Sequence, residues 1–234
     1  MTSISISRRT LIKHLGLGVS LVSLSATGVV HAATTSRTTL TPDEALQRLK
    51  EGNEHFVAND GVRQMDDASR RLEIARGQAP FAVLVGCSDS RVSPELLFGR
   101  GLGELFIVRV AGNTVDLAAL GSVEYAVAEL GVPLIVVLGH ERCGAVAAAV
   151  AVVQENATFP GSIGEMVEPI IPAVLKAQNM EGDLLDNSVR ENIRRVVDRL
   201  ENSEAVLRDP IEAGRLKIVG ARYDLEEGKV EFFT

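Results

Sequence analysis

The sequence is poor in the side chains that bind soft metals, with two cysteines and four histidines among 234 residues. This scarcity restricts any soft-metal site to very few positions. No internal repeat and no linker rich in glycine, serine or proline divides the chain after its first 33 residues, which excludes a repeat architecture and favours one domain. The net charge is negative, at −7, so we expect no nucleic-acid partner.

The first 33 residues are predicted to be an export signal. The segment Ser7-Arg8-Arg9-Thr10-Leu11-Ile12-Lys13 precedes a mildly apolar stretch over residues 15–30, and Val30-His31-Ala32 offers small residues at a cleavage site. This pattern resembles a twin-arginine signal. An uncleaved membrane anchor is the weaker alternative, because glycines and serines interrupt the apolar stretch. We therefore predict a periplasmic protein with no stable membrane span after processing and one domain over residues 34–234.

Removal of residues 1–33 sharpens the picture of the mature chain. It deletes three basic residues and no acidic ones, so the net charge moves from −7 to −10. Only His55 and His140 then remain as histidines. His55 has no motif around it, and we expect a surface or core residue there.

Two apolar, β-branched runs end at the remaining soft ligands. Residues 81–86 precede Cys87, and residues 133–139 precede His140 and Cys143. Such runs are typical of buried parallel strands, and sites in open α/β sheets lie beyond the carboxyl ends of the strands. Two thiolates and one imidazole suit zinc and leave a fourth position for water. A disulfide between the cysteines, or simple burial of two small apolar residues, stays open as an alternative.

Alternating strand and helix signals predict an α/β fold with a parallel-core sheet of about four strands plus a C-terminal hairpin or edge strand, flanked by helices. Thr41-Pro42-Asp43-Glu44 is typical of a helix start, and Ser188-Val189-Arg190-Glu191 carries the same capping-box pattern. The glycine-rich segment 99–103 precedes a strand, so we interpret it as a turn and not as a phosphate loop. The predicted strands are 81–86, 105–110, 134–139, 216–219 and 230–233, and further helices are predicted to begin at Ser93-Pro94-Glu95 and to cover 116–130 and 145–153.

The motif Cys87-Ser88-Asp89-Ser90-Arg91, followed by His140-x-x-Cys143, resembles the β-class carbonic anhydrases. The resemblance covers nearly the whole predicted mature chain. It implies one zinc ion per chain on Cys87, His140 and Cys143, and reversible hydration of carbon dioxide to bicarbonate and a proton through zinc-bound hydroxide. The other matching stretches are residues 51–56, 109–113, 139–145 and 219–224.

The resemblance also implies roles for residues around the metal. Asp89, paired with Arg91, would orient the zinc-bound hydroxide, or, when released from Arg91, would become a fourth metal ligand; an ordinary loop ion pair is the plainer alternative. Gln78 matches a hydrogen-bond donor of the plant-like branch, and the Gly144 amide is another candidate donor. Phe106 and Tyr125 match pocket-lining positions, with core packing as the alternative.

The missing tryptophan argues against the bicarbonate-regulated branch, which uses one in its anion pocket. Because two thiolates offset the charge of zinc, we predict activity that rises toward alkaline pH. We expect a homodimer or higher even homo-oligomer with a small-molecule substrate. Carbonyl sulfide or carbon disulfide as substrate, or a noncatalytic zinc or thiol-redox module, are the alternative functions.

Overall fold

The computed structural model describes residues 37–60 and 67–233, so the predicted export signal lies outside the described residues. Sixteen elements occur in this part of the chain. In chain order they are α1 (Pro42–Ala58), α2 (Ala68–Ile74), β1 (Ala82–Gly86), α3 (Pro94–Leu97), β2 (Leu105–Arg109), η1 (Ala111–Asn113), α4 (Leu117–Ala128), β3 (Leu134–His140), α5 (Gly144–Glu155), α6 (Ser162–Val167), η2 (Glu168–Ile170), α7 (Ile171–Ala177), α8 (Leu184–Glu201), α9 (Ala205–Glu212), β4 (Lys217–Tyr223) and β5 (Val230–Phe233).

The strands form one mixed sheet in the order β2-β1-β3-β4-β5. The β1–β2, β1–β3 and β3–β4 pairs are parallel, whereas β4 and β5 form an antiparallel hairpin. This confirms the predicted parallel core with a C-terminal edge strand. Every residue of β1 and β3 is buried, as expected for central strands covered on both faces.

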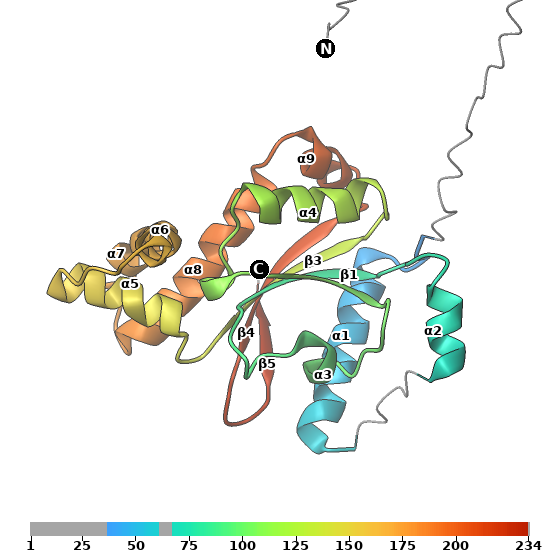
Figure 1. Cartoon of the computed structure of the whole chain (residues 1–234), viewed down its shortest axis with the longest axis horizontal. Coiled ribbons are helices and arrows are strands. Elements are labelled where there is room, and N and C mark those ends of the chain that lie inside the picture. Colours follow the sequence, from blue (N-terminus) through green and yellow to red (C-terminus); the bar gives the residue numbers. More distant parts are fainter. Residues whose placement is uncertain (1–36, 61–66, 234) are drawn as a thin grey trace, which may run out of the picture. The chain divides into compact units, whose positions relative to one another are not determined.

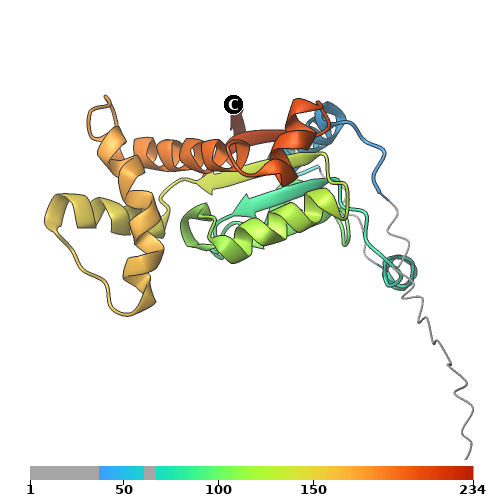
Figure 2. The same ribbon diagram turned by 90° about the horizontal axis from the view of Figure 1, so that it is seen from above.

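Helices cover both faces of the sheet (Figure 1). On one face, α4 and α8 pack against alternate strand residues such as Val83 and Ile135. On the other face, α1 and α3 pack against their neighbours, such as Leu84 and Val136. Helices α5, α6 and α7 lie beyond the end of β3 (Figure 2), and α5 and α7 pack against α8. Within the described ranges, no helix has both the length and the hydropathy to cross a membrane.

The capping signals were partly right. Helix α1 begins at the predicted capping box, in which the Thr41 hydroxyl accepts from the Glu44 N–H and the Glu44 carboxylate accepts from the Thr41 N–H. The similar prediction at Ser188 is wrong, because α8 begins one turn earlier with Asp183 as its N-cap. Ser188 lies inside the helix, where its hydroxyl donates to the Leu184 carbonyl.

Candidate metal centre

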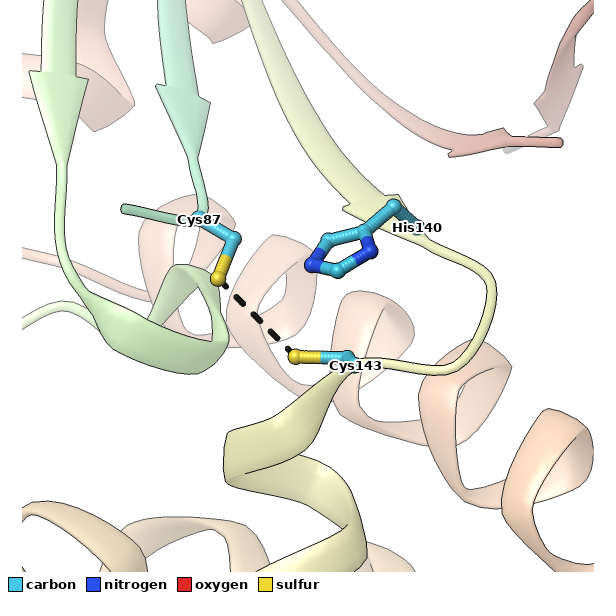
Figure 3. Close-up of side chains that lie close together, drawn as sticks. All are labelled: Cys87, His140 and Cys143. Atoms are coloured by element: carbon cyan, nitrogen blue, oxygen red, sulfur yellow. Dashed lines mark hydrogen bonds between the residues drawn. The ribbon is translucent and has the colours of Figure 1, made fainter. Parts of the chain in front are cut away.

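The sheet topology brings the three predicted soft ligands together. Cys87 directly follows β1, His140 ends the adjacent strand β3, and Cys143 is the N-cap of α5. Because β1 and β3 are parallel neighbours, their carboxyl ends open at the same edge of the sheet. Figure 3 shows the three side chains converging from these segments.

The ligand atoms have a spacing suited to a metal ion. The two sulfurs and a ring nitrogen lie within 4.8 Å of one another, and all three residues are buried. The sulfurs of Cys87 and Cys143 are 3.9 Å apart. Two sulfurs on one tetrahedral zinc, each at about 2.3 Å, are separated by roughly 3.8 Å. A disulfide would need about 2.05 Å, and both cysteines are free, so the disulfide alternative does not describe this structure.

His140 presents a buried nitrogen with no hydrogen-bond partner. Its Nδ1 lies 2.9 Å from the Glu141 carbonyl, which can only accept, so Nδ1 carries the proton. The Nε2 lone pair then faces the sulfurs without a partner. An unpaired buried polar atom is unfavourable, and a histidine held through its other nitrogen is typical of metal ligands. The site therefore fits a zinc ion. Simple burial of two cysteines does not explain why a histidine nitrogen without a partner faces their sulfurs.

The two thiols compete for one negative charge. The pKa of Cys87 is lowered, chiefly by the hydrogen bond from the Cys143 thiol and also by the backbone N–H groups of Asp89 and Gly112, against the effect of burial. The pKa of Cys143 is raised because its thiol donates to Cys87 and because it is buried. A divalent cation between the sulfurs would stabilise both thiolates, so both cysteines could be ionised at the same time.

Asp89 lies beside the ligand cluster and is held by Arg91. The Arg91 Nε and Nη2 donate to the two carboxylate oxygens at 2.9 and 2.7 Å, and the Arg91 backbone N–H adds a bond of 3.0 Å. These bonds hold the pKa of Asp89 well below its usual range. The carboxylate Oδ2 is 3.8 Å from His140 Nε2. An ionised acceptor is thus fixed at the edge of the candidate metal position.

Arg109 is a site residue to which sequence reasoning gave no role. It ends β2, in register with Gly86 on β1. Its Nε donates to the Cys87 carbonyl at 2.8 Å, and its Nη2 donates to the Asp89 carbonyl at 2.6 Å. Arg109 therefore fixes the loop that carries both the metal ligand and the carboxylate. A guanidinium at the carboxyl end of the strand beside β1 was the signal that could have revealed it.

The predicted substrate-binding residues do not gather around this cluster within the chain. Gly144 begins α5 next to Cys143, but Gln78 precedes β1, at the opposite end of the strand from Cys87. The five residues of β1 alone span about 16 Å at roughly 3.3 Å each. Phe106 pairs with Val83 near the start of β1, and its ring centroid is 6.3 Å from that of Tyr125.

His55 also lies away from the cluster. Its side chain is 63% exposed on α1, and its Nδ1 is 3.0 Å from the Asp60 carboxylate. This confirms the expected surface alternative, and nothing in its surroundings connects it to the metal ligands.

Known proteins resemble this chain in sequence and in structure. The carbonic anhydrase family model matches residues 82–230. Carbonic anhydrase 2 of Mycobacterium tuberculosis is 42% identical over 188 residues, which cover 80% of this chain and 91% of the relative. The carbonic anhydrase of Mycolicibacterium smegmatis is 40% identical over 190 residues, with coverages of 81% and 92%.

Two solved structures have a similar fold. The β-carbonic anhydrase CcaA superposes with a TM-score of 0.64 at 29% identity, and the match covers 81% of this chain and 95% of that one. The Coccomyxa β-carbonic anhydrase in complex with acetazolamide gives a TM-score of 0.62 at 27% identity, with coverages of 80% and 85%.

Proposed function

This chain belongs to the β-class carbonic anhydrases and catalyses the zinc-dependent, reversible hydration of carbon dioxide to bicarbonate and a proton, and we propose that Cys87, His140 and Cys143 are its zinc ligands. The observation that carries this assignment is the convergence of the three ligand atoms around a buried, unpartnered His140 Nε2. When bound, zinc supplies the acidity that makes water a nucleophile at neutral pH.

Asp89 orients the reacting water by accepting a hydrogen bond from it. The proposal is supported by the position of the carboxylate, 3.8 Å from His140 Nε2, and by Arg91, which occupies both oxygens and keeps them ionised. The Gly144 amide at the start of α5 offers a donor to a product oxygen. Arg109 keeps the Asp89 loop in place.

Replacement of Asp89 by alanine tests this division of roles. The Asp89→Ala variant should keep about one zinc per chain and lose most of its carbon dioxide hydration, since the metal ligands remain while the orienting acceptor is removed. The control is Asp43→Ala. It breaks a surface ion pair that lies away from the site, in which the Asp43 carboxylate is 2.8 Å from the Lys217 Nζ. Unchanged turnover in Asp89→Ala would exclude the orienting role, and metal-free, fully active wild type would exclude the zinc site.

A second copy of the chain completes the substrate pocket with its Gln78, Phe106 and Tyr125, in a homodimer or higher even homo-oligomer. The support is that Gln78 is exposed and precedes β1, so the whole length of that strand separates it from the cluster of its own chain. Mixed assemblies test this. A Gln78→Ala chain paired with an Asp89→Ala chain contains one site with both wild-type residues if Gln78 acts across the interface, so mixing two weakly active variants should restore activity. No restoration would refute the shared pocket.

The chain belongs to the plant-like branch of the family, and bicarbonate does not regulate it. Gln78, Phe106 and Tyr125 match that branch, and the chain has no tryptophan. Steep, cooperative inhibition of carbon dioxide hydration by rising bicarbonate would refute this assignment.

The enzyme is exported to the periplasm by the twin-arginine route, and residues 34–234 form its catalytic domain. The support is the Arg8-Arg9 signal and the small residues before Ala33 in the sequence. The mature protein should appear in the periplasmic fraction with an N-terminus near Ala33. Replacement of Arg8 and Arg9 by lysine should retain it in the cytoplasm, whereas unaltered export would refute the twin-arginine route.

A further inference from the structure

Gly112 connects a metal-ligand sulfur to a distant helix. Its backbone N–H donates to the Cys87 sulfur at 3.3 Å. Its carbonyl accepts a hydrogen bond of 2.8 Å from the side-chain amide of Asn192, on α8. Both bonds are buried, and the second joins residues 80 positions apart.

Asn192 lies on the buried side of α8. Only 2% of its surface is exposed, and Val189, Ile193 and Val196 of the same helix belong to the apolar core. Burial of an amide is unfavourable unless it is hydrogen-bonded. The bond to Gly112 is therefore the contact that makes an asparagine suitable at this position.

Gly112 itself has a conformation that needs support. Its φ is +69° and that of Asn113 is +46°, so two successive residues occupy the left-handed region. A Cβ at position 112 would lie 2.6 Å from the Ile170 Cδ1 and 3.1 Å from the Ala145 Cβ, so a side chain does not fit. Because glycine has wide conformational freedom, the direction of its N–H relative to its own carbonyl, which lies in the next peptide, depends on groups that hold the carbonyl in place. Asn192 is such a group.

We infer that Asn192 is a positioning residue of the metal centre: it holds the Gly112 carbonyl, which fixes the φ and ψ of Gly112, so that the Gly112 N–H, in the preceding peptide, points at the Cys87 sulfur. A donor beside a coordinating thiolate orients the sulfur and stabilises its negative charge. Partners behind the ligands typically change metal affinity 10–100-fold. The inference rests on the proposed zinc site, and it concerns how tightly that site holds metal.

The test compares two leucine substitutions on one helix. Asn192→Leu removes the donor and keeps a side chain of similar size. The control, Asn187→Leu, removes a bond of the same kind, 3.0 Å from the Asn187 amide to the Glu181 carbonyl. Zinc affinity is measured by competition with a chelator, and the sulfur-to-metal charge-transfer band is recorded with cobalt(II) in place of zinc. We expect the zinc dissociation constant to rise about 10–100-fold and the band to shift in Asn192→Leu only.

The outcomes separate three conclusions. If Asn192→Leu lowers the melting temperature but leaves zinc affinity and the cobalt band as in the wild type, Asn192 is merely structural and the inference is wrong. If the wild type binds no stoichiometric zinc, the proposed function fails instead. If Asn192→Leu does not fold, the wild type loaded with cadmium-113 decides: scalar couplings should join the Asn192 amide nitrogen to the Gly112 carbonyl carbon, and the Gly112 amide proton to cadmium. Absence of either coupling overturns the inference.

Discussion

Substitution of Gly52 by alanine should destabilise the protein, whereas the same substitution at Gly121 should stabilise it. Both glycines lie inside helices, α1 and α4. A Cβ at Gly52 would be 2.0 Å from the Phe98 carbonyl oxygen and 2.7 Å from its carbon, and these backbone atoms cannot rotate away. A Cβ at Gly121 would meet nothing within 4 Å.

The expected magnitudes follow from two opposing effects. Alanine in place of a helical glycine stabilises by about 0.5–1 kcal/mol. At Gly52, α1 must also move away from Phe98 by about 1 Å, and overpacking of this kind costs about 1–3 kcal/mol. We therefore expect a net loss of up to about 2.5 kcal/mol for Gly52→Ala. At roughly 2–4 °C per kcal/mol, its melting temperature should fall by up to about 10 °C, whereas that of Gly121→Ala should rise by about 1–4 °C.

Circular dichroism at a fixed protein concentration is the suitable assay, because the chain has no tryptophan to report unfolding by fluorescence. A melting temperature of Gly52→Ala at or above that of the wild type would refute the close contact between α1 and Phe98. A lower value for Gly121→Ala would refute the open space beside α4.

Three further predictions concern stability and pH. Asn53→Ala removes three hydrogen bonds, to Leu97, Gly228 and Val230, and should lower the free energy of unfolding by about 3 kcal/mol, measured by thermal or denaturant unfolding. The control Gln47→Ala breaks only a surface bond to Glu51 and should lower it by less than about 0.5 kcal/mol. Equal losses in the two variants would contradict this. The pKa of Glu191 is lowered because hydrogen bonds from Lys176 and Arg194 outweigh the opposing effect of burial, so its carboxylate stabilises the fold above its unfolded pKa of about 4.3 and this stabilisation is lost as the pH falls. With both proteins metal-free and reduced, the melting temperature of Glu191→Gln should therefore fall less than that of the wild type between about pH 5 and pH 3.5. A parallel decline of the two melting temperatures would count against this. Carbon dioxide hydration should rise between about pH 6 and pH 9, because the two thiolates offset the charge of zinc, and a flat profile would contradict this.

The three residues of the candidate metal centre could be predicted because their signals are local. A run of β-branched residues predicts a buried strand, and a cysteine directly after it must lie at the sheet edge, as Cys87 does. The start of α1 was equally local, since both partners of its capping box are three residues apart. The same local pattern was misleading at Ser188, because a serine inside a helix can donate to the preceding turn.

The rest of the site depends on contacts between distant segments. Nothing near Asn192 in sequence indicates that its amide meets Gly112, and the two are brought together only when α8 packs on the sheet. Gln78 illustrates a different gap. Its place before β1 was evident, but that place becomes informative only when the direction of the strand and the distance to Cys87 are considered together.

The positions of two candidate ligands at the ends of β1 and β3 have a consequence for how the metal centre is built. These strands are joined along their length by parallel pairing and are buried on both faces, so the sheet itself brings Cys87 and His140 within reach of one another. In a zinc finger the ion itself supplies the folding energy, whereas here strand pairing and the burial of the two central strands set the relative position of two of the three candidate ligands.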